Sequence, residues 1–113
     1  MLDQFLKDIR VIDLSQYLPA PFATRMLADM GADVVKVEPP GGEPGRHFDA
    51  DGRPGDSPFW RLNNAGKTVV TIDLKSDEGR LALTTLLRNA DILLESYRPG
   101  VLDHLGFGAA ALW

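Results

Sequence analysis

Residues 9–14 read Ile-Arg-Val-Ile-Asp-Leu and residues 33–37 read Asp-Val-Val-Lys-Val, and these two stretches decide the fold class. Both are rich in β-branched residues, which favours buried strands. Between them Phe22, Met26 and Met30 recur at every fourth position, which predicts a helix with these side chains as its apolar stripe. A strand, a helix and a strand within about thirty residues predict a right-handed βαβ unit with parallel strands.

The same alternation continues toward the C-terminus. Residues 68–73 and 91–95 are predicted to form two more strands. Between them Ser76 is a good N-cap, and the helix that it starts would place Leu81, Leu83, Leu86 and Leu87 on its core face. Residues 101–105 predict a helical turn that Gly106 ends, and residues 108–113 look like the start of a further helix. The fold class is therefore predicted to be α/β with a mostly parallel sheet and flanking helices.

Residues 38–58 interrupt this pattern. They contain five glycines and five prolines, so we expect a long irregular loop. A loop of this length inside a small domain is usually functional or flexible.

Composition excludes several function classes. The chain has 113 residues, which is the size of one domain, and its hydrophobic and charged fractions of 44% and 25% are ordinary for a globular protein. It has no cysteine and two histidines, so disulfides and thiolate chemistry are excluded and no metal is predicted. A net charge of −4 offers no general attraction for nucleic acid. The absence of a long apolar run predicts no membrane span and no secretory signal, and makes the cytoplasm the expected location.

The familiar nucleotide-binding and hydrolase motifs are missing. The turn at residues 15–21 has no glycine, which disfavours an NAD-dependent dehydrogenase. The sequence Gly66-Lys67-Thr68 resembles the end of a P-loop, but Arg61 stands where the first glycine is required. No serine lies in a G-x-S-x-G turn. Three carboxylates near strand ends are expected to cap turns rather than to catalyse: Asp13, Asp73 and Glu95.

The order of several short blocks resembles the opening of the class III CoA-transferases. The blocks are residues 11–15, residues 27–42 with Glu38-Pro39-Pro40-Gly41-Gly42, residues 63–68, residues 73–75, and residues 90–101 with Glu95-Ser96-Tyr97-Arg98-Pro99-Gly100. This group includes formyl-CoA:oxalate and carnitine CoA-transferases and the α-methylacyl-CoA racemases. The similarity runs from about residue 9 to residue 107 and is specific to the family rather than to a substrate.

The resemblance implies that residues 1–113 are the N-terminal portion of a Rossmann-like, CoA-binding large domain in an interlocked homodimer. Such transferases move CoA between carboxylic acids through a covalent aspartyl intermediate. The nucleophile would lie beyond residue 113, so no catalytic residue is assigned here. The expected ligands are coenzyme A, as a substrate thioester, and a carboxylic acid acceptor. Two alternatives stay open: an α-methylacyl-CoA racemase, and a non-catalytic CoA-binding, nucleotide-binding or dimerisation module.

The resemblance also implies which residues would contact CoA. They are Leu18 near the thioester, then Ile72, Asp73, Leu74 and Lys75, and opposite them Ser96, Tyr97, Arg98 and His104. Three positions depart from residues frequent in the family: Pro39 and His104 replace basic residues, and Ser96 replaces an asparagine. Other basic residues could then bind the phosphates of CoA, namely Arg46, Lys67, Lys75 or Arg98. Of these, Lys67 is expected rather to hold its own loop.

Overall fold

The computed structural model describes residues 2–48, 55 and 57–112, and its centre is a parallel sheet of four strands. The strands are β1 (Arg10–Asp13), β2 (Asp33–Glu38), β3 (Thr68–Thr71) and β4 (Ile92–Leu94), in the spatial order β3-β2-β1-β4. Every pair of neighbours is parallel, with Ile12 of β1 opposite Val35 of β2 and Leu93 of β4. The predicted α/β class with a mostly parallel sheet is confirmed.

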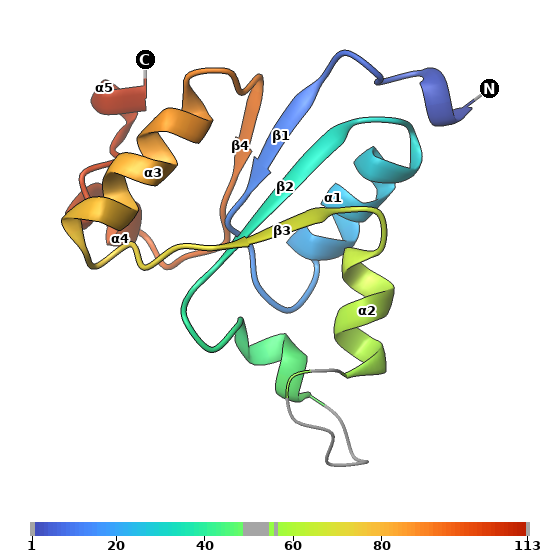
Figure 1. Ribbon diagram of the computed structural model, residues 1–113, viewed down its shortest axis with the longest axis horizontal. Helices are drawn as coiled ribbons and strands as arrows, with labels where there is room; N and C mark the ends of the chain where they lie inside the picture. Colours follow the sequence, from blue (N-terminus) through green and yellow to red (C-terminus); the bar gives the residue numbers. More distant parts are fainter. Residues whose placement is uncertain (1, 49–54, 56, 113) are drawn as a thin grey trace.

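Helices cover both faces of this sheet (Figure 1). One face carries α1 (Ala20–Asp29) and α2 (Pro58–Asn64), and the other carries α3 (Asp77–Leu87), α4 (Val101–His104) and α5 (Ala109–Leu112). Two short 3-10 helices, η1 (Leu2–Gln4) and η2 (Pro44–His47), complete the described elements. The sheet is therefore the middle layer of three, which is why its central strands are buried on both sides.

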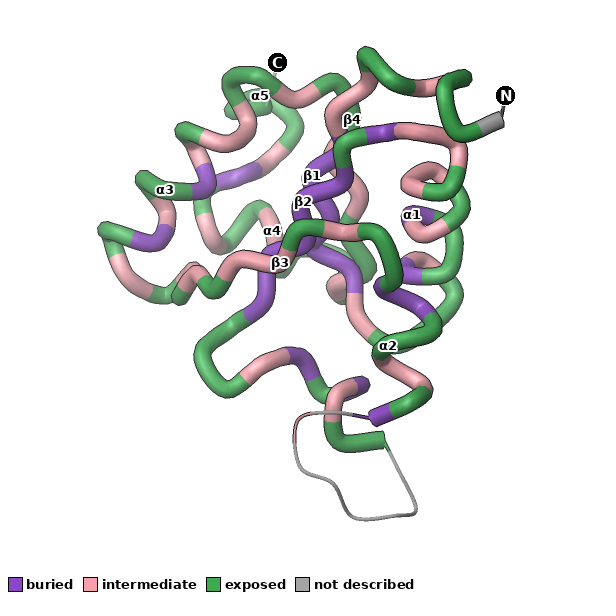
Figure 2. Tube along the Cα trace, turned by 45° about the vertical axis from the view of Figure 1, so that its right-hand side comes forward, coloured by how far each residue is buried: buried purple, intermediate pink, exposed green. Residues whose placement is uncertain are grey.

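The two central strands divide the core into two layers, because successive side chains of a strand point to opposite faces. Val11 and Val34 pack on the α1 face, whereas Ile12 and Val35 pack on the α3 face, where Leu83 is fully buried. Figure 2 shows the resulting buried stretch along β1 and β2. The α1 face becomes polar toward the carboxyl ends of these strands.

Helix α1 forms as predicted, but its predicted apolar stripe does not pack into the core. Phe22 and Met26 are 46% and 48% exposed, and Met30 is only partly buried. The helix instead turns Pro21 and Thr24 toward the sheet. The buried carboxylate at the end of β1 explains this orientation, because it needs a hydroxyl donor from the helix above it.

Helix α3 begins as its sequence predicts. The Ser76 hydroxyl oxygen accepts a hydrogen bond from the Gly79 amide at 2.9 Å, which confirms the N-cap. Leu83 is fully buried and the two leucines at the end of the helix pack against the same core. Leu81 does not join them, because it is 65% exposed and faces away from the sheet.

The Gly/Pro-rich region is more ordered than its composition predicts. Between β2 and β3 the chain forms η2 and the unpredicted helix α2, although residues 49–54 and 56 lie outside the described part. Ser57 caps α2 by accepting a hydrogen bond from the Trp60 amide, and Pro58 occupies its first turn. Ser-Pro is a recognised start of a helix, so the sequence does contain a signal for α2.

Candidate CoA site

A groove with a volume of about 830 Å³ lies at the carboxyl edge of the sheet. Its walls come from the segments that follow all four strands, which is where open parallel sheets bind ligands. We call this the edge groove. Its lining residues are Gln16, Val37, Glu38, Pro39, Ile72–Lys75, Arg80, Tyr97, Pro99, Gly100, Val101, His104 and Leu105.

The edge groove brings together most of the side chains that the sequence singled out. Two segments far apart in the chain form its opposite walls, and the predicted residues among them are Ile72, Asp73, Leu74, Lys75, Tyr97 and His104. Three others do not line it. Leu18 and Arg98 are exposed outside the groove, and Ser96 contacts the backbone of the turn after β1.

The first wall is the tight turn between β3 and α3. The Asp73 side chain accepts a hydrogen bond from the Lys75 amide at 3.0 Å, and its carbonyl accepts one from the Ser76 hydroxyl at 2.8 Å. Gly79 allows this turn to approach α3, because a Cβ there would lie 1.7 Å from the Asp73 carbonyl oxygen. Asp73 therefore has the turn-capping role that its position predicts, and the Lys75 side chain is exposed to solvent.

The second wall contains Tyr97 and the turn that follows it. The Glu95 carboxylate accepts a hydrogen bond from the Tyr97 amide at 2.7 Å, which is again a turn-capping role. Burial raises the pKa of the Tyr97 phenol, and the charges of Glu95 and Asp13 raise it further, so the hydroxyl stays protonated at neutral pH. Gly100 has φ of +87° before α4, a conformation that glycine adopts without strain.

Three basic residues line the edge groove, namely Lys75, Arg80 and His104. The Arg80 guanidinium donates to the Leu74 carbonyl at 3.2 Å and pairs with Asp77 at the surface, so the arginine is held against the first wall. Apolar groups such as Ile72 complete the floor. This combination suits a ligand with an anionic end and a less polar body.

Behind the groove, Asp13 and Lys67 form a buried ion pair with 2.9 Å between Oδ2 and Nζ. The Thr24 hydroxyl donates to Asp13 at 2.6 Å, and Ser15 donates through both its amide and its hydroxyl. Burial alone would raise the pKa of Asp13, but the charge of Lys67 and these hydrogen bonds outweigh it and lower that pKa below 3.8. Asp13 is thus a structural carboxylate, as its position in the sequence predicts.

Lys67 is fully committed to this pair and its neighbours. Its ammonium also donates to Asn64 Oδ1 at 2.7 Å and to the Pro21 carbonyl at 3.0 Å. Burial lowers the pKa of Lys67 and the Asp13 charge only partly opposes that change. Lys67 therefore holds α1, α2 and β1 together, which agrees with the loop-holding role expected from the sequence, and its ammonium is not available to bind a phosphate.

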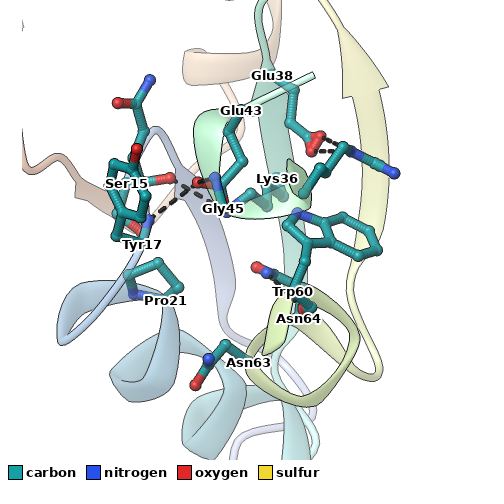
Figure 3. A network of polar contacts seen from close by, with 12 residues as sticks. Ser15, Tyr17, Pro21, Lys36, Glu38, Glu43, Gly45, Trp60, Asn63 and Asn64 are labelled. Atoms are coloured by element: carbon teal, nitrogen blue, oxygen red, sulfur yellow. Dashed lines mark hydrogen bonds and ion pairs between the residues drawn. The ribbon is translucent and has the colours of Figure 1, made fainter. Parts of the chain in front are cut away.

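Arg46 is likewise occupied. Its Nε lies 2.6 Å from Glu38 Oε2, and its guanidinium stacks 3.7 Å from the centroid of the Trp60 ring. Figure 3 shows Glu38 and Trp60, the two residues that Arg46 contacts. The expectation that Arg46 substitutes for a phosphate-binding residue is not met, because the pair fixes η2 to β2 and α2.

Neither a metal site nor a membrane-spanning helix is found among the described residues. Within residues 2–48, 55 and 57–112, no three His, Cys, Asp or Glu side chains converge as metal ligands do. In the same part of the chain no helix has both the length and the apolar character that crossing a bilayer requires.

Comparison with known proteins gives consistent matches across almost the whole chain. The family model described as CoA-transferase family III matches residues 6–113. Succinyl-CoA–D-citramalate CoA-transferase of Chloroflexus aurantiacus is 40% identical over 91% of the chain. Formyl-CoA:oxalate CoA-transferase of Streptomyces coelicolor is 38% identical over 95% of it.

Solved structures agree with these matches. The crystal structure of a hypothetical protein from Mycobacterium tuberculosis superposes with a TM-score of 0.85 at 38% identity, over 95% of this chain and 29% of its own. A CAIB/BAIF family protein from Brucella suis gives a TM-score of 0.84 at 32% identity, over 92% of this chain and 29% of its own. The chain also spans only 26% of the length of each curated relative named above.

Proposed function

This chain belongs to CoA-transferase family III, and from that premise we propose that its edge groove binds coenzyme A in an enzyme that transfers CoA between carboxylic acids. The observation that carries the proposal is the convergence of Ile72–Lys75 with Tyr97 and His104 around one groove at the carboxyl edge of the sheet. A CoA thioester has a phosphate-rich nucleotide end and a neutral pantetheine arm, and the groove offers basic groups and apolar walls to match.

The charge distribution supports one orientation of the ligand. Lys75 and Arg80 would face the phosphates, because cationic donors favour phosphate oxygens, and His104 would offer them a ring N–H. Gln16, which follows β1, would then lie toward the neutral arm. In this orientation the thioester lies near the turn at residues 15–21. That turn contains no charged residue.

The chemistry itself is proposed to use chain beyond residue 113, with residues 1–113 as the N-terminal portion of the CoA-binding large domain. An aspartate there would attack the thioester carbonyl, release the CoA thiolate and form a mixed anhydride. The thiolate would then attack the aspartyl carbonyl and release the carboxylate product, leaving an aspartyl-CoA thioester for the acceptor. Transfer is favoured over racemisation because both curated relatives named above are CoA-transferases. An intertwined homodimer in the cytoplasm belongs to the same proposal.

Titration calorimetry of the full-length protein with CoA tests this function. We expect saturable binding with one site per chain, and weaker binding for Lys75→Ala. Glu78→Ala provides a control, because Glu78 is exposed nearby, in the first turn of α3, but does not line the groove. Absence of heat at millimolar CoA, or equal affinities for the wild type and Lys75→Ala, would refute the assigned site.

A further inference from the structure

A second buried ion pair lies beside the turn that follows β1. Lys36 Nζ is 2.7 Å from Glu43 Oε1, and the two side chains are 0% and 1% exposed. Neither side chain lines the edge groove. A buried ion pair adds little stability compared with well-packed apolar side chains, so its presence alone does not account for these two residues.

The hydrogen bonds of this pair are directed at the turn (Figure 3). Glu43 Oε2 accepts from the Tyr17 amide at 2.9 Å and from the Gly45 amide at 3.2 Å. Lys36 Nζ donates to the Ser15 carbonyl at 3.1 Å. The pair therefore fixes the backbone on both sides of Gln16.

Gln16 itself is held from the other side. Its amide donates to Ser96 Oγ at 3.0 Å, in the segment that follows β4. Two consecutive amides of the turn, those of Gln16 and Tyr17, are thus bound by side chains that follow the two strands flanking β1. Tyr17 has φ of +58°, a conformation that a residue with a side chain adopts only when its surroundings hold it.

We propose that Glu43 and Ser96 are positioning residues that keep Gln16 in the wall of the edge groove. Gln16 is the part of the turn that lines the groove, and residues 15–19 belong to no helix or strand that would fix it otherwise. Lys36 balances the charge of Glu43 and holds the carboxylate toward Tyr17. This inference rests on the proposed function for its effect on CoA, but its effect on the turn is independent of any ligand.

Two double variants separate the effect of the acceptor oxygen at residue 43 from the effect of the Lys36–Glu43 charges. Lys36→Met with Glu43→Gln removes both charges and keeps an acceptor oxygen for Tyr17. Lys36→Met with Glu43→Leu removes both charges and the acceptor, and its apolar pair fits a buried site. The two proteins differ in whether residue 43 can accept hydrogen bonds from the Tyr17 and Gly45 amides.

Hydrogen exchange of peptides spanning residues 15–21 in the full-length protein is the first readout. We expect faster exchange in the Leu variant than in the Gln variant, with similar exchange in α3 and similar melting temperatures. In calorimetry the Leu variant should bind CoA about tenfold more weakly than the Gln variant, the effect of losing one hydrogen bond to a well-placed acceptor.

Ser96→Ala supplies an independent test if the Leu variant does not fold, because Ser96 is exposed and its loss leaves the core intact. Like the Leu variant, Ser96→Ala should speed exchange at Gln16 and weaken CoA binding. Unchanged exchange at residues 15–21 in these variants would overturn the positioning role. A wild-type protein that binds no CoA would instead overturn the proposed function, and the exchange result would still decide the positioning role.

Discussion

Asp13 and Lys67 lie 54 positions apart in the sequence and form an ion pair in which both side chains are 0% exposed. Removing one partner of such a pair leaves an uncompensated charge in the interior. Lys67→Met in the full-length protein should therefore lower the free energy of unfolding by about 3–5 kcal/mol. Chemical denaturation followed by circular dichroism measures this loss.

The exposed pair Arg10–Asp33 is the matched control for that variant. Its charged atoms lie 2.8 Å apart, but the side chains are 40% and 48% exposed. Asp33→Asn should cost less than about 1 kcal/mol, because solvent screens the interaction. Equal losses in the two variants would contradict the account of Asp13–Lys67 as a buried pair.

The same pair gives the protein an acid-sensitive contribution to stability. Folding lowers the pKa of Asp13 below 3.8, so the unfolded chain takes up the proton first as the pH falls. The contribution is complete above that value and is lost as the pH falls toward the lowered pKa.

Denaturation midpoints between about pH 5 and pH 2 test this linkage in the full-length protein. The double variant Asp13→Asn with Lys67→Met should lose less stability over this interval than the wild type does. The comparison is between the losses of stability as the pH falls, so the stability of the double variant at pH 6 does not affect it. Parallel pH profiles for the two proteins would show that Asp13 does not titrate with folding.

Arg46 stabilises the fold through the planar shape of its guanidinium as well as through its charge. It reaches Glu38 and stacks on Trp60 at once, which the compact ammonium of lysine cannot reproduce. Arg46→Lys should destabilise the full-length protein by about 1–2 kcal/mol, because it weakens a partly buried ion pair and removes the cation–π interaction. The emission of Trp60 should change in the folded state.

Arg10→Lys is the control for Arg46→Lys, because Arg10 pairs with Asp33 at the surface. Its effect should stay below about 0.5 kcal/mol, and tryptophan emission should not change. A similar loss of stability from both variants would mean that the stacking on Trp60 adds nothing.

Much of this architecture can be predicted from the sequence because it depends on local patterns. The β-branched runs predicted three of the strands and the short apolar run at residues 92–94 the fourth, each to within a few residues, and Ser76 predicted the start of α3. Asp73 and Glu95 cap turns as their positions predict. The convergence of residues 72–75 with residues 97–104 required the family resemblance.

Two of the errors, at α1 and at Arg46, come from polar contacts that local sequence patterns do not show. Helical periodicity predicted Phe22 and Met26 as part of the apolar stripe of the helix, but Thr24 faces the sheet instead, where it binds Asp13. Pairings such as Asp13 with Lys67 join residues that no local pattern connects. For the same reason, Arg46 looked like a free cation in the sequence, although it pairs with Glu38.

Gly79 couples the stability of α3 to the shape of the edge groove. A methyl group there would meet the Asp73 carbonyl oxygen, so the turn at residues 72–75 must shift. Gly79→Ala should destabilise the full-length protein by about 1–3 kcal/mol, although alanine favours helices. It should also weaken CoA binding in calorimetry. The exposed neighbour Glu78→Ala should change neither quantity by much, and a stabilising effect of Gly79→Ala would contradict the close approach.

His104 offers the sharpest test of where the phosphates bind. It is exposed and lines the edge groove. Arginine keeps its charge at every working pH and can bind a phosphate through two donors. His104→Arg should therefore tighten CoA binding about two- to fivefold at low salt, the gain of one exposed ion pair.

The remaining histidine is the control for that variant. His47 is exposed on η2 and does not line the edge groove, so His47→Arg adds the same charge elsewhere on the protein. It should leave the CoA affinity unchanged at moderate salt, where charges farther apart than about 10 Å are screened. The gain from His104→Arg should shrink as potassium chloride is raised, because the new interaction is solvent-exposed. Equal gains from both variants would indicate a general effect of net charge and would remove His104 from the phosphate end of the groove.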